Sequence, residues 1–413
     1  MNKFDDIRPY NDSEVAPVIQ NLINDSGFIK AISHLRFPRL SLYVSWLLSP
    51  IIKLVLKKQS SNIQSVTELQ NVVSHYMKTM LDEHVSHFSV SGLEKLDKNK
   101  AYLFISNHRD IAMDPAFVNW ALYQNGFDTV RIAIGDNLLT KPYVSDLMRL
   151  NKSFIVNRSA KTNREKFKAS KHLSAYISHS IKEESSNVWI AQREGRAKDG
   201  KDETNAAVIS MLALNRVKPE PLADLIKGLN IVPVAISYEW DPCDAAKANE
   251  LYSLRQQGSY EKGEDEDVGS IAAGISGDKG CVHIAFGDVL AGDYESTEQV
   301  AADIDQQIIS NYVLHPSNLL AASKLDYDVE QLSYGKTKKP YNALSLNIQN
   351  AELDQRIANI PAEQKEILLR IYANPVIGKL NAGYFKFLPS ALSIFTLMTL
   401  LVLAEVEHLK DAR

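Results

Sequence analysis

Six short apolar runs, separated by longer and often helical segments, constrain the fold of this chain most strongly. Runs of this length, rich in Val, Ile and Leu, predict buried strands. Their alternation with helical segments is typical of α/β proteins, in which helices pack on the faces of a sheet. We therefore predict an α/β fold, with a mixed sheet flanked by helices and with helical N- and C-terminal extensions. The runs cover residues 101–105, 130–134, 153–156, 188–191, 231–238 and 282–286.

The composition is that of a globular protein, and it excludes several classes of function. Of the 413 residues, 45% are hydrophobic and 23% are charged, which argues against both disorder and a protein with many membrane spans. The net charge of -4 provides no overall basic field of the kind that nucleic-acid binders use. Cys243 and Cys281 lack the spacing of metal ligands and are too few for a disulfide framework. We therefore expect no metal, no nucleic acid and a reducing cytoplasm.

The sequence pattern divides the chain into three regions. We predict an N-terminal helical region at 1–85, which can contact a membrane interface, a catalytic domain at 86–295 and a C-terminal helical region at 296–413. No apolar segment follows the first residues, as a secretory signal would require, so the catalytic part is expected to face the cytoplasm.

Two apolar stretches and one polar stretch stand out from this pattern. Residues 40–56 are interrupted by Pro50 and Lys53, which favours helices that lie in a membrane interface, with a buried helical hairpin as the alternative. Residues 387–404 carry no charge and approach the roughly 20 residues of a spanning helix. They are predicted to be a spanning helix, an embedded anchor or a core helix. Residues 258–280 are rich in Gly, Asp and Glu, which predicts a mobile surface loop.

A histidine and two acids follow the first predicted strand, where the sequence from Ser106 to Pro115 reads SNHRDIAMDP. Ligand sites in open α/β sheets collect at such strand ends. His108 can take a proton from an alcohol near neutral pH. A carboxylate on the other ring nitrogen would fix the tautomer and stabilise the imidazolium. Either Asp110 or Asp114 could be that partner.

Cations follow two other predicted strands. Arg158 comes after the strand at 153–156, where its planar guanidinium can bind a phosphate. After 188–191, the sequence QREGRAKDG places cations beside Gly195, whose backbone can approach an anion closely. These cations are Arg193, Arg196 and Lys198. The run at 231–236 is predicted to be a buried wall without chemistry.

In this order, the four segments resemble the four sequence blocks of the glycerolipid acyltransferase superfamily, which includes glycerol-3-phosphate and lysophosphatidate acyltransferases. The resemblance spans roughly residues 90–290 and rests on the ordered set. It implies that His108 activates the acceptor hydroxyl and that Glu194, Gly195 and Arg196 hold the acceptor phosphate. It also implies a thioester of coenzyme A or acyl carrier protein as the acyl donor, and no cofactor.

The resemblance thus predicts a phospholipid-biosynthetic O-acyltransferase that acts on the hydroxyl of a glycerol phosphate or a lysophospholipid. We expect it on the cytoplasmic face of a membrane, either peripheral or anchored through an apolar segment. The residues expected to bind substrate are Asn107, Arg109, Arg158, Arg193, Glu194, Gly195, Arg196 and Lys198.

Two departures from the family pattern bear on the site. Five residues separate His108 from Asp114, where the family usually has four, and one residue separates it from Asp110. The orienting acid therefore stays open, with a preference for Asp114 because the following Pro resembles the family's Asp-Pro pairing. Arg196 follows its glycine one position earlier than usual, and Arg193 replaces a Pro. Phosphate contacts are therefore expected to be shared differently among the cations.

Other functions fit the sequence less well or differ in the acceptor. The tripeptide at 108–110 also resembles a protein-kinase catalytic loop, but Pro115 stands where that loop needs Asn. A serine hydrolase would need a G-x-S-x-G elbow, which the sequence lacks. Two alternatives stay open. One is an acyltransferase with a different lipid or alcohol acceptor, and the other is a non-catalytic membrane protein that binds lipid phosphate.

Overall fold

A seven-stranded sheet forms the centre of the protein in the computed structural model, which describes residues 3–383 except for 38–39, 140, 218, 264–265 and 331. Along the sheet the strands are ordered β1-β7-β6-β2-β5-β3-β4. Neighbouring strands are parallel except for β6 and β7, so the sheet is mixed, as predicted. The strands are β1 His87–Ser91, β2 Leu103–Ser106, β3 Arg131–Gly135, β4 Ser153–Val156, β5 Val188–Ala191, β6 Ile231–Tyr238 and β7 Cys281–Phe286.

The six predicted strands are confirmed, with ends shifted by at most two residues. The sequence pattern did not indicate β1, because its residues, HFSVS, alternate apolar with polar side chains and form no apolar run. β1 lies at the edge of the sheet, where it pairs with β7. A strand covered on one side only needs fewer apolar residues than a central strand.

Helices cover both faces of the sheet, and successive residues of a strand point to opposite faces. In β2, Leu103 and Ile105 belong to one hydrophobic core and Phe104 to the other, and all three are fully buried. The first core includes α7 Asn163–Lys182, α8 Ala206–Leu212, α9 Leu222–Gly228 and α12 Thr297–Asn311. The second includes α4 Val66–His84 and α5 Met113–Gln124. Burial on both faces explains why the central strands are continuous apolar runs.

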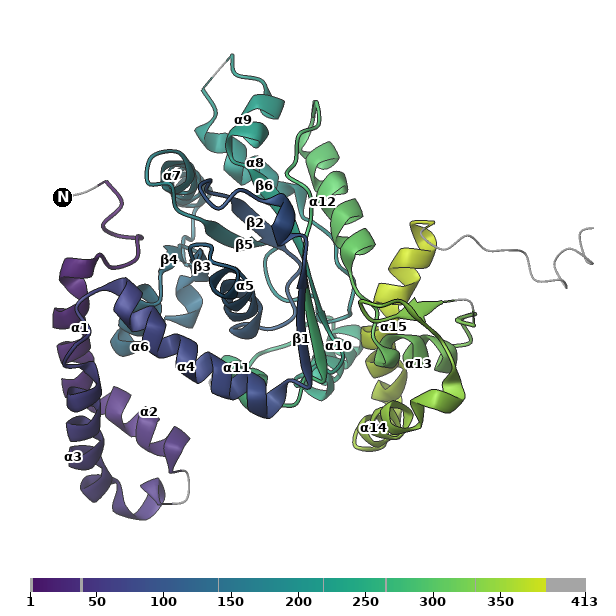
Figure 1. The fold of residues 1–413 in the computed structure, drawn as a ribbon, viewed down its shortest axis with the longest axis horizontal. Helices are drawn as coiled ribbons and strands as arrows, with labels where there is room; N and C mark the ends of the chain where they lie inside the picture. Colours follow the sequence, from purple (N-terminus) through teal and green to yellow (C-terminus); the bar gives the residue numbers. More distant parts are fainter. Residues whose placement is uncertain are drawn as a thin grey trace, which may run out of the picture.

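Helical extensions lie at opposite ends of the molecule, as predicted (Figure 1). One end holds α1 Asp12–Asn24, α2 Ser26–Arg36 and α3 Ser41–Ser60. The other holds α13 Pro316–Lys324, α14 Asn347–Ala358, α15 Lys365–Asn381 and the short strands β8 Ser333–Tyr334 and β9 Lys339–Pro340. The C-terminal helices share the first core with the sheet through residues such as Leu319 and Leu368. The predicted boundaries near 85 and 295 fall between elements, and the division into domains stays a prediction.

The first apolar stretch forms a single helix, α3, which continues through Pro50. One face of this helix is exposed, with exposed fractions of 75%, 48%, 53% and 71% at Trp46, Leu47, Ile51 and Leu54. The alternative of a buried hairpin is therefore wrong for that face. None of the helices in the described parts of the chain is long and apolar enough to cross a membrane. The second apolar stretch, 387–404, lies outside the described residues.

The prediction of a mobile loop at 258–280 is wrong for half of that segment, which contains α11 Glu266–Ser276. Its apolar residues Val268, Ile271, Ala272 and Ile275 recur at spacings of three and four, as an amphipathic helix requires. The glycines and acids around them dominated the composition and hid this pattern. The remaining helices are α6 Pro142–Leu150 and α10 Asp244–Gln257.

Candidate functional site

His108 lies at the carboxyl end of β2, in the turn that leads into α5. Its Nδ1 lies 2.8 Å from Oδ2 of Asp114, and its ring packs edge-on against Trp189 at 5.7 Å between centroids. The histidine side chain is 14% exposed, whereas the aspartate is fully buried. The other ring nitrogen, Nε2, has no hydrogen-bond partner among the described residues. Since the carboxylate accepts a hydrogen bond from Nδ1–H, Nε2 of the neutral ring is left as a base.

Asp114 is fixed by four donors. Its Oδ2 accepts hydrogen bonds from His108 and from the backbone N–H groups of Arg109 at 2.6 Å and Asp110 at 3.0 Å. Its Oδ1 accepts a 2.6 Å hydrogen bond from the hydroxyl of Tyr238. Burial alone would raise the pKa of Asp114, but the hydrogen bonds and the nearby imidazole outweigh it and lower the pKa below its usual value. The carboxylate therefore stays ionised and keeps the ring in one tautomer.

Asp110, the other candidate partner, forms its hydrogen bonds with the backbone of the turn and not with the imidazole. Its Oδ1 accepts hydrogen bonds from the backbone N–H groups of Ala112 and Met113, at 2.9 and 2.8 Å, and so holds the turn that leads into α5. Burial, together with the neighbouring Asp114, raises the pKa of Asp110. Gly274 of α11 packs directly against this carboxyl group, where any larger residue would overlap it. The structure thus brings Asp114 to the ring and assigns Asp110 a contact within the turn.

The side chains of Asn107 and Arg109, which are expected to bind substrate, form hydrogen bonds within the protein. Asn107 exchanges hydrogen bonds with both backbone groups of Ile236, at 2.7 and 2.9 Å. Arg109 donates to Asp202 at 2.6 Å and to the carbonyl of Gly200 at 3.2 Å. Both side chains are buried, and their hydrogen bonds tie the turn to β6 and to the loop after β5. In this arrangement both side chains support the turn, and a direct contact with substrate stays a prediction.

The predicted cations lie around the carboxyl ends of the strands, where His108 also lies. The strands β2, β5, β3 and β4 are parallel neighbours, so their carboxyl ends coincide. The carbonyl of His108 accepts a 2.7 Å hydrogen bond from the N–H of Ala197, so the two loops are in direct contact. Arg158 is 37% exposed at the end of β4 and lies 3.6 Å from Glu194. Arg193 is 28% exposed and lies 4.0 Å from Asp199. These half-exposed guanidinium groups can reach an anion.

The remaining residues of the basic loop differ in their availability. Arg196 is half-buried, with a 3.5 Å contact from its guanidinium to the hydroxyl of Ser270 in α11. Lys198 forms an ion pair with Glu250, which compensates its charge. Gly195 has a φ of 76°, in the left-handed region, and open space where a side chain would lie. A ligand can therefore approach this part of the backbone.

Three residues of the site were missed by sequence reasoning. Tyr238 ends the strand to which no chemistry was assigned, although β6 neighbours β2 and its carboxyl end lies at the same edge. Lys247 of α10 is buried and donates a 2.7 Å hydrogen bond to the carbonyl of Arg109, besides its ion pair with Asp241. Asp202 binds Arg109. No local motif marks Lys247 or Asp202, since only the fold brings them to the turn.

The arrangement can accept a proton at Nε2 of His108, stabilise the resulting imidazolium through Asp114 and hold an anionic group at the arginines. Among the residues that the structure describes, no three His, Cys, Asp or Glu side chains are grouped as a metal site.

Three comparisons with known proteins bear on this site. Residues 87–237 match the family model described as Acyltransferase. Among solved structures, the chain is similar to the 1-acyl-sn-glycerophosphate (LPA) acyltransferase PlsC from Thermotoga maritima. The identity is 13% and the TM-score 0.35, over 71% of this chain and 93% of that chain. No curated protein matches the chain.

Proposed function

We propose that the chain is an acyltransferase, because residues 87–237 match the family model described as Acyltransferase, which supports the resemblance at the level of the family. From this premise we propose that it moves a fatty acyl group from a thioester donor to the hydroxyl of a glycerol phosphate or a lysophospholipid. The donor is a thioester of coenzyme A or acyl carrier protein.

The observation that carries this proposal is the hydrogen bond between His108 and Asp114, which leaves Nε2 as the base. Nε2 takes the proton of the acceptor hydroxyl while the oxygen attacks the thioester carbonyl. Asp114 stabilises the imidazolium that forms. The carbon–sulfur bond then breaks, and the departing thiolate takes up a proton from the imidazolium. General-base catalysis of this kind contributes about 100-fold to 10,000-fold in rate.

A phosphorylated acceptor is favoured by the arginines around the base. Arg158, Arg193 and Arg196 come from two loops and are partly exposed, and their planar groups can bind a phosphate with two hydrogen bonds each. Lys198 contributes less, because Glu250 neutralises it. An acceptor without a phosphate is the alternative within the same chemistry.

The acceptor is tested with a panel of glycerol-3-phosphate, lysophosphatidate, other lysolipids and monoacylglycerol, each with both donor types, by following thiol release. We expect the phosphorylated acceptors to be preferred. Arg158→Gln and Arg196→Gln should raise KM for these acceptors at least tenfold and leave KM for monoacylglycerol unchanged. Arg255→Gln, on the exposed part of α10, is the matched control. Binding of lipid without turnover in any combination would instead identify a non-catalytic lipid-binding protein.

We also propose that α3 places the enzyme on the cytoplasmic face of a membrane. Trp46, Leu47, Ile51 and Leu54 form an exposed apolar face, and Lys57 and Lys58 follow it. Such a face inserts into the headgroup region, and the cations attract anionic lipids. Ile51→Glu should weaken sedimentation with anionic liposomes. Ile348→Glu, which changes a still more exposed isoleucine on α14 at the other end of the molecule, should not. Equal sedimentation of both variants would exclude α3 as the contact.

A further inference from the structure

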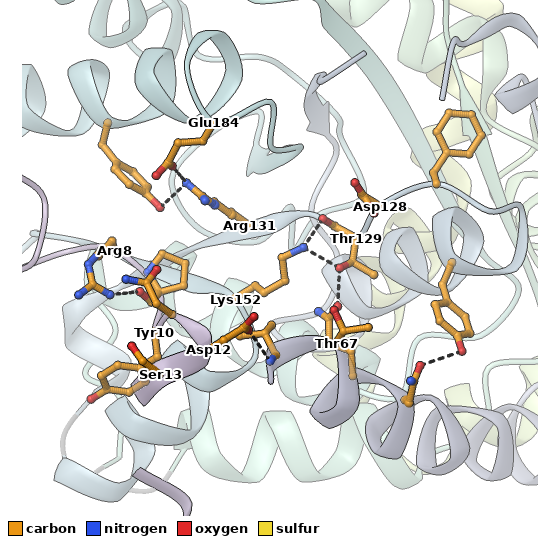
Figure 2. A pocket seen from close by; sticks show the side chains of 18 of the residues that line it. Arg8, Tyr10, Asp12, Ser13, Thr67, Asp128, Thr129, Arg131, Lys152 and Glu184 are labelled. Carbon is orange, nitrogen blue, oxygen red and sulfur yellow. Dashed lines mark hydrogen bonds and ion pairs between the residues drawn. The ribbon is translucent and has the colours of Figure 1, made fainter. Parts of the chain in front are cut away.

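A cavity lies at the end of the sheet opposite His108, where β3 and β4 begin. Its volume is about 820 Å³, and residues of α1, α4, α7 and the loops before β3 and β4 line it. Lys152 directly precedes β4, and Figure 2 shows its side chain extending into the cavity, with Thr129 at its tip. The proposed mechanism uses none of these residues.

The backbone and the side chain of Lys152 are both fixed. Its φ is 61°, in the left-handed region that glycine or asparagine usually occupies. Its carbonyl accepts a 3.0 Å hydrogen bond from Ile132, the second residue of β3, which holds this conformation. A residue with a long side chain in a strained backbone at a cavity points to a function for that side chain.

The ammonium group of Lys152 meets two acceptors from one residue. Nζ donates to the carbonyl of Thr129 at 2.8 Å and to its Oγ1 at 2.9 Å. The hydroxyl can accept because its own hydrogen goes to Gln70 of α4 at 2.7 Å. A neutral amine has two N–H groups and one lone pair. In the neutral form these two bonds use both N–H groups, and the lone pair is left to react.

The surroundings shift the protonation equilibrium of Lys152 towards the neutral form. Burial, together with the charge of Arg131, lowers the pKa of Lys152 to about 8, although Asp128 opposes the shift. Arg131 is itself paired with Glu184. The other charged residues that line the cavity are Arg8 and Asp12. At pH 7.5 about one quarter of such an amine is neutral, against about one in a thousand for an ordinary lysine.

We propose that Lys152 is a site of N-acylation by acyl thioesters. The lone pair of Nζ attacks the thioester carbonyl, a carbon–nitrogen bond forms, the carbon–sulfur bond breaks and the thiol leaves with the proton lost from nitrogen. The product is an amide without charge. This inference rests on the proposed function only for the thioester, which is the electrophile. His108 takes no part in the reaction, because it lies at the carboxyl ends of the strands and Lys152 lies at their amino ends.

The test is to incubate the full chain with acetyl-coenzyme A and to measure amide formation at each lysine by peptide mass spectrometry. At pH 7.5 we expect Lys152 to react at least about tenfold faster than the exposed Lys161, which serves as the internal reference. The ratio should fall steeply between pH 8 and 10, because the neutral fraction of Lys152 saturates while that of an ordinary lysine keeps rising. A rate at Lys152 no greater than at Lys161 would overturn the proposal.

Two variants separate this reaction from the enzyme's own transfer. His108→Ala should leave acetylation of Lys152 unchanged, even though acyl transfer to a lipid is lost. Dependence of Lys152 acetylation on His108 would overturn the proposal, since it would show that the catalytic site transfers the acyl group to the lysine. Asp128→Asn removes the carboxylate that raises the pKa of Lys152, so it should speed acetylation at pH 7.5.

Discussion

Replacement of Asp114 by Asn removes one negative charge from a site whose hydrogen-bond geometry an amide can reproduce. The amide oxygen can take the place of Oδ2 and accept from His108 and from the two backbone N–H groups. The amide nitrogen can then take the place of Oδ1 and donate to the oxygen of Tyr238, whose hydroxyl accepts as well as donates. The ring therefore keeps its tautomer, and the loss is confined to the charge that stabilises the imidazolium.

The magnitude follows from that difference. A hydrogen bond to a charged group is worth about 1.5 to 3 kcal/mol, against about 1 kcal/mol between neutral groups. The imidazolium forms only in the transition state, so about 0.5 to 2 kcal/mol of stabilisation is lost there. Since about 1.36 kcal/mol corresponds to a tenfold change, turnover should fall by about 2-fold to 30-fold. The loss is smaller than the roughly 10,000-fold seen in serine proteases when the tautomer itself is wrong.

The assay is turnover with saturating acceptor and donor, and Asp110→Asn is the matched control. The amide oxygen of an asparagine at 110 can accept the same two backbone hydrogen bonds, and this residue makes no hydrogen bond with the ring, so turnover should change by less than about twofold. A larger loss in Asp110→Asn than in Asp114→Asn would refute the assignment of Asp114. Equal and mild losses in both would show that neither acid orients the imidazole.

Three further predictions concern the support of the site and the stability of the fold. Tyr238→Phe removes one of four donors to Asp114, so the free energy of unfolding should fall by about 1.5 to 3 kcal/mol in urea titrations, while turnover falls less than in Asp114→Asn. Gly258 has a φ of 74° and open space around it, so Gly258→Ala should lower the free energy of unfolding by about 1 to 2 kcal/mol in the same titrations, from backbone strain alone. Gly200 has a φ of 80°, and a methyl group there would also overlap the carbonyl oxygen of Ile371, so Gly200→Ala should destabilise the fold more. Burial lowers the pKa of His283 from 6.5 to about 4, so the unfolded chain binds this proton first as the pH falls. Stability should therefore drop between about pH 6.5 and 4, by up to about 3 kcal/mol from this residue, and His283→Gln should flatten the thermal-denaturation profile over that range.

The sequence predicted the parts of the fold that depend on continuous apolar runs. Buried central strands such as β2 and β6 are uniformly apolar because helices cover both of their faces, so the pattern alone located them. β1 and α11 escaped prediction, since an edge strand alternates with polar residues and a short helix among glycines is hidden in its composition.

The same distinction holds for the site. His108 and the arginines could be named because they directly follow strands, and parallel strands bring such positions to one edge. The choice between Asp110 and Asp114 depends on how the turn bends, which spacing alone does not fix. Lys247 and Asp202 support the turn from distant parts of the chain, so they became visible only in the folded structure.

The most direct test of the central claim is the rate of acyl transfer to lysophosphatidate by His108→Ala, measured beside the unaltered chain. Removal of the general base should lower turnover by about 100-fold to 10,000-fold. The midpoint of thermal unfolding should fall by about as much as in Tyr238→Phe, because each change removes one of the four donors to Asp114 and leaves the rest of the site in place. Near-normal turnover in this variant would contradict the account, since the base would then have to be another group.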